Sequence, residues 1–189
     1  MLIYIHGFNS SPQSTKARQL EARLKSLGKG SAFCCPALPH RPAQAIALLE
    51  REMSKAPARS ITLVGSSLGG YYATWLAETH GVRAVLVNPA ITPHEGLRAY
   101  LGPQRNLYTG EPYELTEQHL AELKALSVER PTRLERYYLM VSTGDEVLDY
   151  RQAVEKYAGA KQLMVEGSDH GFAEFEHHLD SVLEFAEIA

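Results

Sequence analysis

Short runs of apolar, often β-branched residues recur along the chain, and each run ends near a glycine, proline, asparagine or aspartate. Continuously apolar runs bounded by such turn-forming residues are typical of strands that a parallel sheet buries on both faces. We therefore expect six strands, at residues 2–5, 32–38, 61–64, 84–87, 137–141 and 162–165, of which the second has the weakest pattern.

Between these runs, apolar residues recur three or four positions apart, which predicts amphipathic helices. In the first such stretch Ala17, Leu20 and Leu24 share one face, and Gly28 suits the helix end. The expected helices cover residues 15–27, 43–55, 71–79, 115–126, 150–157 and 172–188. Alternation of strands and helices predicts an α/β fold, with helices on both faces of a parallel sheet.

Residues 92–131 break this alternation between the fourth and fifth expected strands. They hold a loop rich in proline and glycine, LGPQRNLYTGEPY, followed by the helix expected at 115–126. An insertion over the carboxyl edge of a parallel sheet usually covers a site. We therefore expect one domain over residues 1–189, with a partly helical lid insert at about 92–131.

Composition excludes several classes of protein. Of 189 residues, 44% are hydrophobic and 22% charged, which argues against disorder, and the net charge of −3 without a basic cluster argues against nucleic acid as a partner. The only cysteines, Cys34 and Cys35, are neighbours and build no disulfide framework. No basic leader precedes MLIYIHGF and no apolar run reaches membrane-spanning length, so we expect a cytoplasmic protein without membrane insertion.

Residues 63–72 read LVGSSLGGYY and contain the pattern G-x-S-x-G between an expected strand and an expected helix. A phosphate-binding loop is excluded because no lysine follows Gly70, and the glycine spacing does not match the dinucleotide fingerprint. The context is that of a nucleophile elbow, a strained turn that presents Ser67 and requires small residues at Gly65 and Gly69. An ordinary loop of glycine and serine is the alternative.

Two polar turns follow later strands in the order that a Ser–acid–His triad of an α/β-hydrolase requires. Asp145 follows the fifth expected strand and His170 follows the sixth, so both lie at the sheet edge that carries Ser67. Glu146 and Asp149 compete with Asp145 for the role of the acid, although Asp149 has the spacing of a helix cap.

The other histidines offer no metal motif. His80, His119, His177 and His178 fall on expected helices and are predicted to be solvated, and H-E-x-x-H is absent. We therefore expect neither a metal nor another cofactor.

Backbone N–H groups of Phe8 and Leu68 are the expected oxyanion hole, because one follows the nucleophile and the other lies in the turn His6-Gly7-Phe8. Apolar residues near the strand ends are candidates for a substrate pocket, with membership of the core as the alternative. These are Tyr71, Val147, Leu148 and Phe172, joined by Tyr100, Leu101, Leu107 and Tyr108 of the insert. Arg98 and Arg105 are candidates for contact with an anionic leaving group.

Several segments together resemble the YqiA-type esterases, small bacterial α/β-hydrolases. They are YIHGFNSSP, VGSSLGGYYATWLA, VNPA, YLGPQRNLYTGEPYEL, TGDEVLDYRQA and the turn Gly-Ser-Asp-His-Gly-Phe, and they span nearly the whole chain. The resemblance implies Ser67, Asp145 and His170 as the triad, and hydrolysis of carboxylic esters or thioesters as the activity. It also implies a hydrolase fold without the first two strands of larger relatives.

The expected function is that of a serine esterase acting on short- to medium-chain acyl esters through an acyl-enzyme. One alternative is an acyl-thioesterase of the acyl-CoA type on the same triad. Another is a binding protein of hydrolase fold with weak activity. The expected partner is a small-molecule acyl ester or thioester, and the sequence does not predict an oligomeric state.

Overall fold

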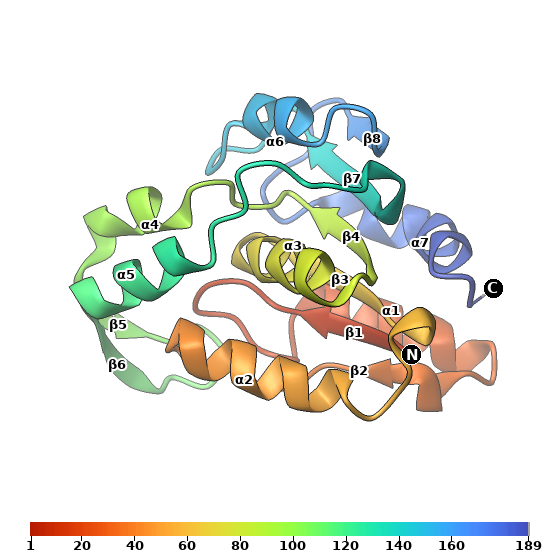
Figure 1. The fold of residues 1–189 in the computed structure, drawn as a ribbon, viewed down its shortest axis with the longest axis horizontal. Coiled ribbons are helices and arrows are strands. Elements are labelled where there is room, and N and C mark those ends of the chain that lie inside the picture. Colours follow the sequence, from red (N-terminus) through yellow and green to blue (C-terminus); the bar gives the residue numbers. More distant parts are fainter. Residues whose placement is uncertain (189) are drawn as a thin grey trace.

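Six strands form one sheet in the order β2-β1-β3-β4-β7-β8, and every neighbouring pair is parallel (Figure 1). The structure, a computed structural model, describes residues 1–188. The strands are β1 (Leu2–Ile5), β2 (Phe33–Cys34), β3 (Thr62–Ser66), β4 (Arg83–Val87), β7 (Tyr137–Ser142) and β8 (Lys161–Val165). The predicted α/β fold with a six-stranded parallel sheet is confirmed.

Alternate residues of each strand face opposite sides, so the sheet separates two apolar cores. Ile3 and Ile5 of β1 pack in the core beneath α2 (Pro42–Met53), α3 (Leu68–His80) and α6 (Tyr150–Lys156). Leu2 and Tyr4 pack in the core beneath α1 (Thr15–Ser26) and α7 (Leu179–Phe185). All residues of β1, β3 and β7 are buried, which explains why these strands read as continuous apolar runs.

Two expected elements are shorter than their patterns. Only Phe33–Cys34 pairs with β1, since Pro36 and Pro39 have no N–H to donate to a ladder and Gly30–Ala32 forms a 3₁₀ turn. The helix expected over residues 172–188 starts late, because Phe172 has φ 55° and Ala173–His178 is a 3₁₀ segment. Further 3₁₀ turns are Ala58–Ser60 and Leu134–Arg136.

The insert at residues 92–131 contains more regular structure than its sequence suggests. It begins with α4 (Pro93–Gly96) and the 3₁₀ turn Leu97–Tyr100, and it ends with α5 (Glu117–Ala125). Between them, the stretch expected to be an irregular loop forms an antiparallel hairpin of β5 (Gly102–Arg105) and β6 (Pro112–Leu115). In Figure 1 these elements lie beyond the carboxyl ends of β1 and β3, beside the start of α2.

Within residues 1–188, none of the helices combines the length and the apolar composition that a bilayer crossing requires.

Candidate active site

Ser67 lies in the sharp turn between β3 and α3, with φ 54° and ψ −121°. A serine rarely adopts a positive φ, and a strained residue at this position is the mark of a nucleophile elbow. The Ser67 side chain is partly exposed, whereas the flanking residues of β3 and α3 are buried. The turn therefore presents one hydroxyl at the carboxyl edge of the sheet.

The glycines around Ser67 allow the turn to close. A Cβ on Gly65 would lie 2.3 Å from the Gly69 carbonyl oxygen, and a Cβ on Gly69 would lie 1.9 Å from the carbonyl oxygen of Ile5. Both distances are far below van der Waals contact, so no larger residue fits. Gly70 allows a similar approach of α3, since its Cβ would lie 2.7 Å from Pro89.

A chain of hydrogen bonds connects Ser67 with His170 and Asp145. The Ser67 hydroxyl lies 3.0 Å from Nε2 of His170, and Nδ1 of His170 lies 2.9 Å and 3.0 Å from the carboxylate oxygens of Asp145. Because a carboxylate only accepts, Nδ1 carries the proton and Nε2 is free to accept from Ser67. The structure thus brings together the three residues that the sequence selects.

Asp145 is held as an anion. Its side chain is only 1% exposed, and its Oδ1 accepts the N–H groups of Val147 at 2.8 Å and Leu148 at 2.9 Å. Burial by itself raises the pKa of Asp145, but the hydrogen bonds from His170, Leu148 and Val147 outweigh it and hold the pKa below its usual range.

The rival carboxylates have other partners. Glu146 accepts the backbone N–H of His170 at 2.9 Å, so it holds the histidine loop rather than the imidazole. Asp149 caps α6 by accepting the N–H of Arg151, which confirms the cap predicted for it.

Asn88 also belongs to this site, although it is not among the residues that the sequence motifs predict. It follows β4 with φ 41° and is buried. Its amide donates to the carbonyl oxygens of Asp169 at 3.0 Å and His170 at 3.1 Å, and its oxygen accepts the N–H of Ser142 at 2.8 Å. One side chain thereby joins the ends of β4 and β7 to the histidine turn. A polar residue directly after a buried strand was the available signal.

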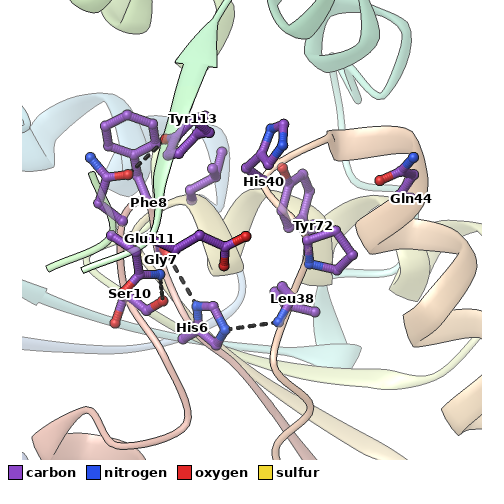
Figure 2. A pocket seen from close by; sticks show the side chains of 14 residues that line it. His6, Gly7, Phe8, Ser10, Leu38, His40, Gln44, Tyr72, Glu111 and Tyr113 are labelled. Atoms are coloured by element: carbon purple, nitrogen blue, oxygen red, sulfur yellow. Dashed lines mark hydrogen bonds between the residues drawn. The ribbon is translucent and has the colours of Figure 1, made fainter. Parts of the chain in front are cut away.

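The loop after β1 places Phe8 near Ser67. Within residues 1–188, neither the Phe8 N–H nor the Leu68 N–H donates a hydrogen bond, so both donors remain available to a ligand. The buried His6 fixes the loop, because its Nε2 accepts the N–H of Leu38 at 3.1 Å and its Nδ1 contacts the Gly7 carbonyl oxygen at 3.2 Å (Figure 2). Burial lowers the pKa of His6, so this imidazole is neutral.

The hairpin of the insert is fastened to the same loop. Asn9 accepts the hydroxyl of Tyr113 at 2.7 Å and donates to Gln104 at 3.2 Å, so it bridges both strands of the hairpin. Asn106 donates to the Ser10 carbonyl oxygen at 2.8 Å, and the N–H of Leu107 donates to the Asn9 carbonyl oxygen at 2.9 Å. The hairpin therefore supports the loop that carries Phe8.

The other end of the insert is fastened to α2. Arg41 forms an ion pair with Glu122 of α5, and Nδ1 of His40 lies 2.9 Å from Nε2 of His119. The prediction that His119 is solvated is wrong, since it is 2% exposed. Its Nδ1 accepts the N–H of Thr116, the residue before α5, so the ring folds back onto the start of the helix that carries it.

An apolar cavity of about 480 Å³ opens beside Ser67 and His170, between the insert and the turn after β7. Val147 and Leu148 line it, as predicted, together with Ile91, Leu97 and Tyr100.

Two pocket predictions are wrong, because both aromatic rings belong to the cores. Tyr71 is buried and donates its hydroxyl to the Leu123 carbonyl oxygen at 2.7 Å. Phe172 is 1% exposed and packs on Phe175.

Of the remaining pocket candidates in the insert, only some line a cavity that reaches Ser67. Tyr108 lines a second cavity at Ser67, whereas Leu101 and Leu107 are exposed and line neither of the cavities that reach Ser67. Arg98 is exposed and paired with Glu117 at 2.8 Å, and Arg105 lines neither cavity.

A third cavity, of about 320 Å³, is lined by Phe8, His40 and Tyr113 and does not include Ser67 (Figure 2). Across residues 1–188, no three histidine, cysteine, aspartate or glutamate side chains converge as metal ligands.

Solved structures of low sequence identity share this fold. Alpha/beta hydrolase domain-containing protein 10 from mouse superposes with a TM-score of 0.71 at 15% identity, covering 97% of this chain and 87% of its own. The monoacylglycerol lipase of Paleococcus ferrophilus superposes with a TM-score of 0.68 at 13% identity, covering 100% of this chain and 94% of its own. The fold is therefore that of the α/β-hydrolases.

A family model described as "Uncharacterised protein family (UPF0227)" matches residues 1–187. The UPF0227 protein PM0825 of Pasteurella multocida is 24% identical over 194 aligned residues, covering 99% of both chains. The chain therefore belongs to the UPF0227 family, the YqiA-type family that its motifs resemble.

Proposed function

We propose that this protein is a serine hydrolase that cleaves carboxylic esters of apolar acyl groups through an acyl-enzyme. The observation that carries the proposal is the continuous set of hydrogen bonds from Ser67 through His170 to the buried Asp145, mounted on a strained elbow. The hydrolase fold, which lipases share, supports it as analogy.

In the first half-reaction, the Ser67 oxygen attacks the ester carbonyl carbon while Nε2 of His170 takes the hydroxyl proton. Asp145 keeps the His170 proton on Nδ1 and stabilises the imidazolium that forms. As the tetrahedral intermediate collapses, the bond to the leaving oxygen breaks and His170 returns the proton to that oxygen. Water then attacks the acyl-enzyme by the same steps, which releases the acid and restores Ser67.

The Phe8 and Leu68 N–H groups suit the developing oxyanion. One belongs to the first residue of α3, where the helix dipole favours negative charge, and the other to the loop held by His6 and Asn9. Losing one such donor typically costs about a hundredfold or more in rate.

The apolar cavity suits the acyl group. It reaches Ser67 and His170, and its volume of about 480 Å³ is in the range of small-molecule sites. Short- to medium-chain acyl groups are the proposed substrates, and thioesters form the second arm of the test below.

The proposal is tested by labelling with a fluorophosphonate probe and by turnover of p-nitrophenyl esters and acyl thioesters of graded chain length. Wild-type protein is expected to form a covalent adduct at Ser67 and to hydrolyse the esters. Ser67→Ala is expected to lose both properties while its thermal unfolding stays close to that of wild type. The matched control is Ser66→Ala, which keeps the hydroxyl at the elbow.

Turnover retained in Ser67→Ala would reject Ser67 as the nucleophile. Folded wild-type protein that forms no adduct and turns over no ester would favour the binding protein of hydrolase fold.

A further inference from the structure

A second cavity that reaches Ser67 differs in chemistry from the apolar one. Its volume is about 240 Å³, and Ser67 and His170 line it together with the first turn of α1 and Tyr108 of the insert. Ser14, directly before α1, lines the cavity with Thr15 and Lys16 of the first turn, so hydroxyl and ammonium groups take the place of the aliphatic side chains of the apolar cavity.

Lys16 is incompletely paired. Its Nζ donates to the carbonyl oxygen of Gly171 at 2.5 Å. Gly171 is the residue directly after His170. Within residues 1–188, no carboxylate lies within 4.0 Å of Nζ and no second acceptor bonds to it. An ammonium group has three hydrogens to donate, so Nζ can donate to a ligand as well as to Gly171.

Lys16 is a cation at neutral pH although it is partly buried. Burial lowers its pKa to about 8, and the charges of Asp169 and Asp145 oppose that shift from a distance. A partly buried cation is stabilised when an anion binds beside it. Of the lysines and arginines in the described chain, Lys16 is the only one that lines a cavity reaching Ser67.

The start of α1 adds to this preference for negative charge. The N–H groups of Thr15 and Lys16 donate no hydrogen bond within residues 1–188, and the first turn contains no acidic residue. Ser14, Thr15 and Lys16 all line the second cavity, so the start of α1 faces the same space as Lys16.

In the proposed reaction, the two cavities hold different parts of the substrate. The leaving oxygen must lie near His170, which protonates it, and His170 lines both cavities. Since the acyl group takes the apolar cavity, the polar one is left for the leaving group. We propose that Lys16 and the start of α1 bind a carboxylate or phosphate on the leaving group, so the substrates are apolar acyl esters of small anionic alcohols. This proposal rests on the proposed function.

The test compares kcat/KM for butyryl esters that differ only in leaving-group charge. Butyryl glycolate is compared with butyryl glycolamide, which has nearly the same shape without charge. Butyryl 2-hydroxyethyl phosphate is compared with its dimethyl phosphate ester, so the two pairs distinguish carboxylate from phosphate. A third pair, methyl hemisuccinate and methyl succinamate, carries the charge difference on the acyl side instead.

Wild type is expected to prefer the anionic member of at least one leaving-group pair by about tenfold or more, the usual scale for a charged hydrogen bond. Lys16→Met is expected to lose this preference ratio, and Lys16→Arg to keep most of it. Arg98→Met is the matched control, since it removes an exposed cation that lines neither cavity and should leave the ratio unchanged. Thermal unfolding establishes that each variant is folded.

Equal turnover within both leaving-group pairs overturns the proposal, and so does an unchanged ratio in folded Lys16→Met. A preference confined to the hemisuccinate pair also overturns it, because it places the anion on the acyl side. Failure of the proposed function is a different result, in which none of the esters is hydrolysed and Ser67 takes no probe.

Discussion

At the scale of single residues, the site depends on which groups Asp145 contacts. Its carboxylate is buried and accepts the N–H groups of Val147 and Leu148 as well as the Nδ1 proton of His170. These contacts leave the carboxylate one orientation and leave His170 one tautomer. The neighbouring Glu146 accepts only the backbone N–H of His170, so proximity in sequence does not make it a substitute.

Asp145→Asn is expected to lower kcat by on the order of a thousandfold or more, because an amide can hold the imidazole in the wrong tautomer. Ester turnover is the measurement, and thermal unfolding shows whether the variant is folded. Glu166→Gln, an exposed acid after β8, is the control and is expected to be near wild type. A folded Asp145→Asn protein with wild-type kcat would contradict the role given to Asp145.

The rate of the wild-type enzyme is expected to rise with pH between about 5 and 8, the range in which an imidazole base loses its proton. Asp145 stays ionised throughout this range, since its pKa lies below the usual value. The measurement is kcat/KM for a neutral ester against pH. A rate that is flat over this range would count against His170 as the base.

At the scale of elements, the elbow and the hairpin restrict the backbone around Ser67. Gly69 brings α3 against the end of β1, which gives the nucleophile and the oxyanion loop one relative position. The hairpin holds that loop from the other side through Asn9 and Ser10. The insert is thus part of the support of the site as well as its cover.

Gly69→Ala is expected to destabilise the fold by about 3 kcal/mol or more, because the new methyl group would clash with the β1 backbone and both lie in packed elements that cannot shift apart. Gly96→Ala is the matched control, since nothing lies within 4 Å of its added Cβ. The free energy of unfolding of Gly96→Ala is expected to equal that of wild type or to exceed it by up to about 1 kcal/mol. Urea unfolding measures both, and equal stabilities would contradict the close packing.

Tyr113→Phe is expected to lower kcat about tenfold with little change in KM. It removes the bond to Asn9 and loosens the loop of Phe8, which costs part of the roughly hundredfold effect of deleting an oxyanion donor. Steady-state kinetics separates the two parameters, and Glu114→Gln on the same strand is the control. A rise in KM alone would assign Tyr113 to substrate binding instead.

At the scale of the whole molecule, the groups whose pKa the fold lowers stabilise it in the same pH direction. Burial lowers the pKa of His6 and His119, and an ion pair with Arg41 lowers that of Glu122. Hydrogen bonds lower the pKa of Asp145 although burial opposes them. In every case the unfolded chain binds the proton more tightly than the folded one, so acid favours unfolding.

The free energy of unfolding is therefore expected to fall steadily as pH is lowered from about 6.5, through the histidines first and the carboxylates below about 5. Urea titrations at pH 7, 5.5 and 4 measure it. Glu122→Gln is expected to flatten the acidic part of the curve. Stability that does not change over this range would show that these groups have the same pKa in both states.

Much of the fold follows from local patterns. Five of the six strands lie within a few residues of their apolar runs, since buried parallel strands need continuous apolar sequence. The sequence does not predict the hairpin because Pro103 and Pro112 are typical of a loop, yet both residues pair across it. Tyr71 and Phe172 were misplaced because an aromatic residue near a strand end has the same pattern in a core as in a pocket.

The sequence by itself determined the elbow and the chain order of Ser67, Asp145 and His170. Steric demands in a tight turn act between near neighbours, and parallel strands bring their carboxyl ends to one edge. Only the tertiary structure decided that Asn88 joins the histidine turn to the sheet and that Lys16 lies beside Gly171. Those contacts join residues that lie 81 and 155 positions apart in the chain, and no local pattern specifies which distant groups the folded chain places together.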